Sequence, residues 1–130
     1  MRLLLDTCAL LFFIADSDDL SPRIKALIRD PGSDVFVSAV TAAELACAAD
    51  RGRLQLRSHW RSWWHDVLSQ SSWPCLPVTR EIVEEAFSLP QPIHRDPADR
   101  IIIGTARVES LTVVTTDRLI LAYPHVTCLS

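Results

Sequence analysis

The chain has 130 residues, 48% of them hydrophobic, and this length predicts one domain over residues 1–130 with no room for a second. The formal net charge is −3, and no stretch reaches the ~18 apolar residues that a membrane-spanning helix needs. Asp6 interrupts the apolar N-terminal run and no small-residue cleavage pattern follows, so we expect a cytoplasmic protein without membrane association.

Short apolar strands alternate with amphipathic helices along the chain, which predicts a parallel sheet covered on both faces. The boundaries follow from capping residues, β-branched runs and prolines. In chain order, the pattern predicts a strand over 2–5, helices over 7–15 and from Ser21-Pro22 onward, a strand over 35–37, helices over 41–50 and 58–68, a short extended piece over 76–78, helices over 79–87 and from Asp96-Pro97 to 108, and strands over 112–116 and 126–129.

Four acidic residues stand where these elements end or begin. Two of the acids follow strands directly, at the edge where an open parallel sheet binds its ligands. The other two lie in the first turns of helices. Carboxylates brought within a few ångströms of one another need compensating positive charge, and an all-oxygen set suits Mg²⁺ or Mn²⁺. The predicted chemistry is metal-assisted attack of water on a phosphoryl centre. The four acids are Asp6, Glu44, Asp99 and Asp117.

Helix capping is the alternative explanation of each acid. Thr41-x-x-Glu44 has the form of a capping box, in which the glutamate reaches back to a backbone N–H. Asp96-Pro-Ala-Asp99 also fits a helix start, with Asp96 as the cap and the second aspartate favoured by the helix dipole. The two acids that close strands fit caps as well. If capping were their only role, the protein would be a binding module.

Two other enzyme classes also use acids at strand ends, and the sequence argues against both. A haloacid-dehalogenase-like phosphatase needs a second aspartate two residues after the first, but Cys8 stands there. A phospho-receiver expects a lysine after a late strand, but Lys25 is the only lysine. The acids therefore fit metal-dependent phosphoryl chemistry better than either class.

The cysteines lack the spacing of a zinc site, and in a reducing cytosol we expect them to be buried free thiols. Among the histidines, His94 is of interest because it lies two residues before Asp96. The four cysteines are Cys8, Cys47, Cys75 and Cys128.

A stretch rich in arginine and tryptophan follows the helix over 41–50. It suits either an amphipathic helix with a partner-facing tryptophan side or a surface that tracks an RNA backbone and stacks bases. The candidate RNA contacts are Arg51 and Arg53 in this stretch, together with Arg100, which follows Asp99.

Four segments, in this order and spacing, resemble the PIN-domain ribonucleases, and within them the VapC-type toxins of prokaryotic toxin–antitoxin pairs. The third segment is the most specific, because an aspartate, proline, small residue, aspartate and arginine rarely open an isoleucine-rich helix elsewhere. The segments are Leu4-Leu5-Asp6-Thr7, Ser38-x-x-Thr41-x-x-Glu44-Leu45, His94-Arg95-Asp96-Pro97-Ala98-Asp99-Arg100 and Val114-Thr115-Thr116-Asp117.

This resemblance implies a three-layer α/β/α PIN-like domain with a central, mainly parallel sheet. It implies an Mg²⁺- or Mn²⁺-dependent endoribonuclease that cleaves single-stranded regions of RNA by metal-activated water. It also implies a homodimer and an inhibitory VapB-type antitoxin, together forming a heterotetramer or a larger assembly. The antitoxin would wrap an amphipathic segment over apolar helices. The candidates are the helix over 7–15 and the tryptophan-rich helix over 58–68.

The resemblance further implies which residues act. Thr7 and Thr115 match positions that hydrogen-bond the acids or a metal-bound water, and Asp96 is a nearby acid common in this toxin group. The aspartates are expected to be direct metal ligands, and Glu44 to act partly through water. The catalytic and metal-binding residues are Asp6, Glu44, Asp99 and Asp117.

Overall fold

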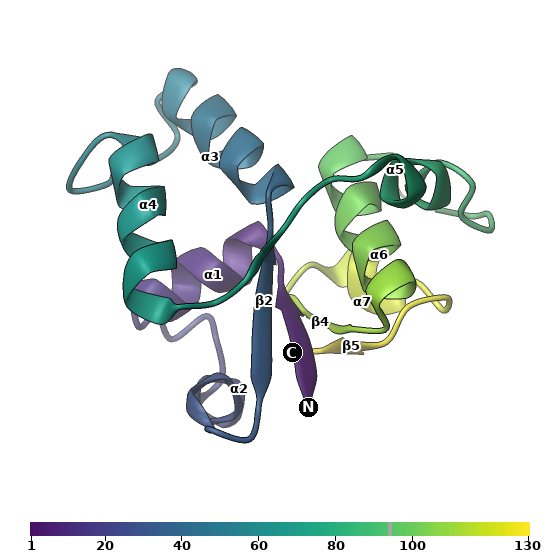
Figure 1. The fold of residues 1–130 in the computed structure, drawn as a ribbon, viewed down its shortest axis with the longest axis horizontal. Helices are drawn as coiled ribbons and strands as arrows, with labels where there is room; N and C mark the ends of the chain where they lie inside the picture. Colours follow the sequence, from purple (N-terminus) through teal and green to yellow (C-terminus); the bar gives the residue numbers. More distant parts are fainter. Residues whose placement is uncertain (94) are drawn as a thin grey trace.

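A parallel sheet with strand order β3-β2-β1-β4-β5 runs through the centre of the computed structural model, which describes residues 1–93 and 95–130 (Figure 1). The predicted strands are confirmed, although those near the sheet edges are shorter than expected. The strands are β1 (Arg2–Leu5), β2 (Asp34–Ser38), β3 (Cys75–Leu76), β4 (Thr112–Val114) and β5 (Cys128–Leu129).

Helices connect the strands, and the sequence predicted all but the last of those described. That helix follows Asp117 directly and spans five residues, which is too short for a helical period to show in the sequence. The helices are α1 (Thr7–Ile14), α2 (Pro22–Arg29), α3 (Val40–Asp50), α4 (Trp60–Ser71), α5 (Arg80–Ala86), α6 (Pro97–Glu109) and α7 (Arg118–Ala122).

Alternate residues of β1 point to opposite faces of the sheet, and each face has its own core. Leu3 and Leu5 pack with residues of α1, α2 and α4, whereas Leu4 packs with residues of α6 and α7. Figure 1 shows α1, α2 and α4 on one side of the sheet and α5, α6 and α7 on the other. The predicted three-layer α/β/α fold is therefore confirmed.

The strand order reverses at β1, and this fixes where a site can form. The chain builds β1, β2 and β3 in one direction and then returns to place β4 on the other side of β1. The Asp6 N–H continues this pairing beyond β1 by donating to the carbonyl of Val114, at 3.1 Å. The carboxyl ends of β1 and β4 therefore lie side by side, where an open parallel sheet has its ligand crevice.

The capping box, the alternative explanation of Glu44, does not form at the start of α3. The helix begins at Val40 with Ala39 as its cap residue, and this cap makes no side-chain hydrogen bond. Instead, the Ser38 hydroxyl accepts a hydrogen bond from the Val40 N–H at 3.1 Å. Thr41 is buried inside the first turn, so its hydroxyl and Glu44 are available for tertiary contacts.

The cysteines are free thiols, as expected, but their predicted burial is wrong. Cys8, Cys47 and Cys75 are exposed and Cys128 is half-buried. An apolar sequence neighbourhood did not predict burial because it does not fix which side of its element a residue occupies; only Cys128 of the four packs against a core. Across the described residues, no helix combines the length and the apolar character needed to span a bilayer.

Candidate active site

Asp6 ends β1 and is held by two hydrogen bonds, one to each carboxylate oxygen. Its Oδ1 accepts from the Ala9 N–H at 2.8 Å and so caps α1. Its Oδ2 accepts from the Thr115 hydroxyl at 2.5 Å. The side chain is buried, and this desolvation raises its pKa despite the two bonds, with the charge of Asp117 adding to the effect. The ionised acid is therefore costly unless positive charge is supplied.

Asp117 follows β4 and is tied to Asp6 through the same threonine. The Thr115 hydroxyl, while donating to Asp6, accepts a hydrogen bond from the Asp117 N–H at 3.0 Å. Asp117 Oδ1 caps α7 by accepting from the N–H groups of Leu119 and Ile120 at 2.8 and 3.3 Å. The two acids that close strands are thus both helix caps and neighbours at one edge of the sheet.

Glu44 reaches the site from the first half of α3 and is held by Thr7. The Thr7 hydroxyl donates to Glu44 Oε1 at 2.6 Å. Thr41 Oγ1 lies 3.1 Å from Thr7 Oγ1, and because the Thr7 proton is committed to the glutamate, Thr41 donates this second bond. Burial raises the pKa of Glu44, and the charges of Asp96 and Asp6 raise it further.

Three carboxylates form a compact group at the start of α6. One ligand oxygen each from Glu44, Asp96 and Asp99 lies within 4.8 Å of the others. Asp96 also caps α6, because its Oδ1 accepts from the Asp99 N–H at 3.0 Å. All the donors are carboxylate oxygens, which hard divalent cations prefer. Asp96, for which a supporting role was predicted, thus offers an oxygen to the same carboxylate group as Glu44 and Asp99.

Cys8, in the first turn of α1, lies in the electrostatic field of all four predicted acids. Desolvation of the thiol is the largest cause of a pKa raised to about 11, and the negative charges of the acids add to it. The charges of acids from four separate segments thus act on one thiol, in agreement with the hydrogen bonds and the carboxylate group described above. The acids that act on the thiol are Asp6, Glu44, Asp99 and Asp117.

The family model described as PIN domain matches residues 3–125. The chain belongs to the PIN domain family. It is 29% identical over 122 residues to "Ribonuclease VapC22" of Mycobacterium tuberculosis, an alignment that covers 94% of this chain and 92% of that protein.

Solved structures share the fold of this PIN domain over nearly its whole length. FitAcB from Neisseria gonorrhoeae is 25% identical with a TM-score of 0.66, covering 98% of this chain and 96% of its own. VapBC2 from Rickettsia felis, bound to a DNA fragment from its promoter, is 16% identical with a TM-score of 0.72, covering 99% and 98%. A toxin–antitoxin complex from Klebsiella pneumoniae is 18% identical with a TM-score of 0.67, covering 98% and 96%.

The three predicted RNA contacts of the PIN domain do not lie together. Arg51 and Arg53 are exposed beyond the C-terminal end of α3, and at about 1.5 Å per residue Arg51 is roughly 10 Å along the axis from Glu44. Arg100, in contrast, is in the α6 turn that follows Asp99. Arg100 is thus the only one of the three that borders the acids. His94 lies outside the described residues.

Thr41 is part of the site, although sequence reasoning assigned it only to a helix cap. It is fully buried and connects to Glu44 through Thr7. Its spacing of three residues from Glu44 puts both side chains on one face of α3. That spacing is compatible with a capping box or with two side chains on the inward face of α3. Because α1 packs against α3, Thr41 and Glu44 both lie on the inward face and interact with Thr7.

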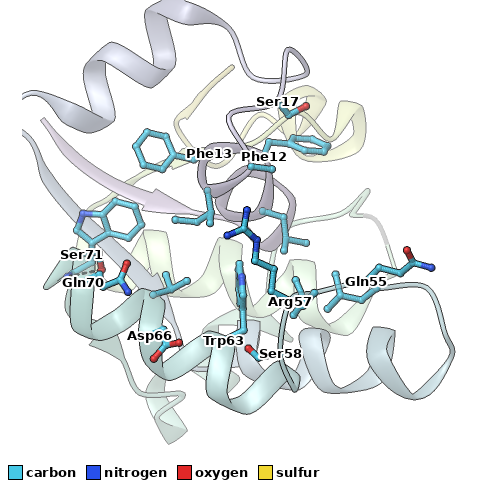
Figure 2. Close-up of a pocket in the computed structure, with 17 residues that line it drawn as sticks. Phe12, Phe13, Ser17, Gln55, Arg57, Ser58, Trp63, Asp66, Gln70 and Ser71 are labelled. Atoms are coloured by element: carbon cyan, nitrogen blue, oxygen red, sulfur yellow. Dashed lines mark hydrogen bonds between the residues drawn. The ribbon is translucent and has the colours of Figure 1, made fainter.

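A cavity of about 1090 Å³ lies between α1 and α4, on the face of the sheet to which Leu3 and Leu5 point (Figure 2). Residues of α1, of the segment 54–58, of α4 and Trp73 line it, and we call it the α1/α4 groove. Its lining is mainly apolar. Figure 2 shows Arg57 reaching into the groove beside Trp63, with Phe12 and Phe13 on the opposite wall. Both helices predicted to meet an antitoxin contribute to it.

Proposed function

We propose that this PIN-domain protein is a metal-dependent endoribonuclease that cleaves single-stranded regions of RNA and acts as a cytoplasmic toxin. The observation that supports it is the meeting of acids from separate segments at one edge of the sheet: Thr115 links Asp6 to Asp117, and Glu44 and Asp99 share one compact carboxylate group. Acids that serve only as helix caps have no need to gather from four segments, because like charges in one pocket destabilise the fold. The similarity to a protein named as a ribonuclease favours RNA as the substrate.

The acids fit a divalent cation. Burial is the largest cause of the raised pKa values of Asp6 and Glu44, and neighbouring acids add to it, so a nearby cation would favour the ionised form of both side chains. Glu44, Asp96 and Asp99 already place carboxylate oxygens within reach of a common ion. We therefore propose Mg²⁺ or Mn²⁺ as the cofactor, held by these residues together with Asp6 and Asp117. Such an ion makes water a better nucleophile at neutral pH and neutralises charge that develops on the phosphate.

The surrounding hydroxyls keep the acids in place for this chemistry. Thr115 orients Asp6 and fixes the backbone at Asp117, and Thr7 orients Glu44. Each threonine donates its proton to a carboxylate, which favours the ionised, cation-binding form of that acid. These outer contacts reduce the reorganisation that the site requires when RNA binds.

The α1/α4 groove is the proposed docking surface for a cognate VapB-type antitoxin. Solved structures with this fold include toxin–antitoxin complexes. The mainly apolar lining suits the apolar face of an amphipathic segment, and Arg57 and Asp66 offer charges for its polar edge. We further propose a homodimer that assembles with the antitoxin into a heterotetramer or a larger complex.

Cleavage of a total-RNA pool by the purified protein tests the enzymatic function. We expect new RNA ends in Mg²⁺ or Mn²⁺, none in EDTA, and none with Asp99→Asn at any metal concentration. Asp34→Asn is the matched control, because Asp34 is exposed at the start of β2, away from the carboxyl ends of the strands. Metal-independent cleavage, or full activity of Asp99→Asn, would refute the proposed mechanism.

A binding module remains the second candidate, because Asp6, Asp96 and Asp117 all do cap helices. The two functions differ in how the protein responds to divalent ions. Acids that only cap helices would give no saturable Mn²⁺ binding in a calorimetric titration. We expect saturable binding that Asp99→Asn weakens.

A further inference from the structure

Phe87 is an exposed aromatic residue that contacts Arg100, the residue after Asp99. It lies at the C-terminal end of α5 and is 51% exposed. The Arg100 guanidinium carbon lies over its ring, 5.6 Å from the centroid. The pair therefore presents an aromatic ring and a planar cation next to each other, with about half of the phenylalanine in contact with solvent.

Close packing of α5 against α6 fixes the position of Phe87. A Cβ atom placed on Gly104 would lie 3.0 Å from the backbone of Ala86, so only glycine permits this approach without a shift. One turn further along α6, Arg107 Nε donates to Glu85 Oε1 at 2.7 Å. These contacts hold the end of α5 in register, and Phe87 is the next residue after Ala86. Its position is therefore set by the fold.

The pair borders the metal-binding carboxylates. Arg100 follows Asp99 directly and lies four residues after Asp96, so Arg100 and Asp96 share one face of α6. Side chains of a helix lean toward its N-terminus, which brings Arg100 over the turn that contains both aspartates. Phe87, through its contact with Arg100, therefore lies near the first turn of α6, which supplies two acids of the carboxylate group.

We infer that Phe87 and Arg100 form a stacking platform for one unpaired RNA base next to the cleaved phosphodiester. This inference rests on the proposed ribonuclease function and adds a determinant of specificity to it. A pocket of carboxylates contacts phosphate through a cation and reads no base, so recognition must come from its margin. Unpaired bases stack on aromatic rings and on arginine guanidinium planes, and both are present here.

Removing one RNA base and removing the Phe87 ring should therefore disrupt the same stacking contact. Each change should lower kcat/KM by the same factor, and the two losses should not add. The substrate is a single-stranded oligoribonucleotide with a cleavage site mapped in total RNA, and each member of a series lacks the base at one position. We expect Phe87→Leu, which keeps an apolar side chain without a π face, to lower kcat/KM about 5-fold or more. Wild-type protein should show the same loss at one abasic position near the cut. Phe87→Leu should be insensitive to that position.

Two further variants complete the design. Phe87→Trp should retain activity, because an aromatic face is preserved. Val83→Ala, at an exposed apolar residue one turn earlier on α5, should leave every oligonucleotide unaffected. Because about half of Phe87 is exposed and leucine keeps an apolar side chain there, Phe87→Leu should fold normally, which thermal denaturation checks.

The outcomes separate this inference from the function on which it rests. Unchanged cleavage by Phe87→Leu would overturn the platform while leaving the nuclease intact. An equal loss on every oligonucleotide, abasic or not, would also overturn it, because the phenylalanine would then act only on the structure. Failure of the wild-type protein to cut any RNA would refute the proposed function, and this inference with it.

Discussion

Thr115 donates a hydrogen bond to Asp6 across 109 residues of sequence, at 2.5 Å, and accepts one from the Asp117 N–H. One hydroxyl thus connects the acid that ends β1 to the acid that follows β4. The two strands are neighbours only because the sheet order reverses at β1. This hydroxyl is the most direct link between the topology of the sheet and the proposed chemistry.

Replacing Thr115 with valine should lower kcat/KM about 10- to 100-fold, the usual cost of losing an outer contact to a metal-binding side chain. Loss of the hydrogen bond also raises the pKa of Asp6 further, because burial is then opposed by one fewer donor. The acidic limb of the pH–rate profile should therefore move to higher pH. Thr115→Ser keeps the hydroxyl and should keep both properties. A valine variant with wild-type kinetics would show that the bond does not position Asp6.

Asp96 has two roles that substitution can separate. Asparagine caps helices as well as aspartate does, so Asp96→Asn should leave the free energy of unfolding nearly unchanged while Mn²⁺ affinity falls about 10-fold or more. Asp96→Ala should lose the same affinity and also about 1 kcal/mol of stability. Chemical denaturation and calorimetric titration measure the two quantities. If Asp96→Asn bound Mn²⁺ as tightly as the wild type, Asp96 would be only a cap.

The raised pKa of Glu44 makes the metal-free protein sensitive to pH. Between the ordinary pKa of 4.5 and the raised pKa of the folded state, the folded protein holds a proton on Glu44 that the unfolded chain has lost. Stability in EDTA should therefore fall as the pH rises through the raised value, and Asp6 acts in the same direction from its ordinary value of 3.8. The protonated form of each acid is the one that burial favours.

Glu44→Gln should remove its share of this pH dependence. We expect the variant to be more stable than the wild type in EDTA at neutral pH, and the difference to vanish below pH 4.5. Glutamine still accepts the bond from Thr7. Glu84→Gln, at an exposed residue of α5, is the control and should give no such gain. Thermal denaturation at a series of pH values decides, and a destabilised Glu44→Gln at neutral pH would contradict the argument.

A charge placed in the α1/α4 groove should weaken the antitoxin complex. Ile14 lines the groove and is 42% exposed, so Ile14→Asp changes the surface with little effect on the core. Burying the new carboxylate against an apolar segment should reduce antitoxin affinity about 10-fold or more, measured by calorimetry. Leu119→Asp is the control, because Leu119 is 60% exposed on α7 and does not line the groove. An unchanged affinity for Ile14→Asp would place the antitoxin elsewhere.

Local sequence signals determined the elements of this protein and the segments that hold its acids. Apolar runs, Ser21-Pro22 and Asp96-Pro97 predicted most strand and helix boundaries, because capping and periodicity act within a few residues. Because Asp6 and Asp117 each follow a predicted strand, the sequence placed both at the edge formed by the carboxyl ends of the strands. These predictions depend on backbone geometry, which neighbouring residues fix.

Tertiary packing alone decided how the acids are held and what lies beside them. A helix cap was the alternative role considered for Thr41, but contact with Thr7 of α1 gives it a buried role in the site. Asp96 joins Glu44, and Phe87 meets Arg100, only because separate helices pack at one edge of the sheet. Side chains far apart in sequence leave no periodic signal of their distance. Capping bonds form within one helical turn, so the sequence can predict them. The site brings together residues from separate segments, so only the fold determines it.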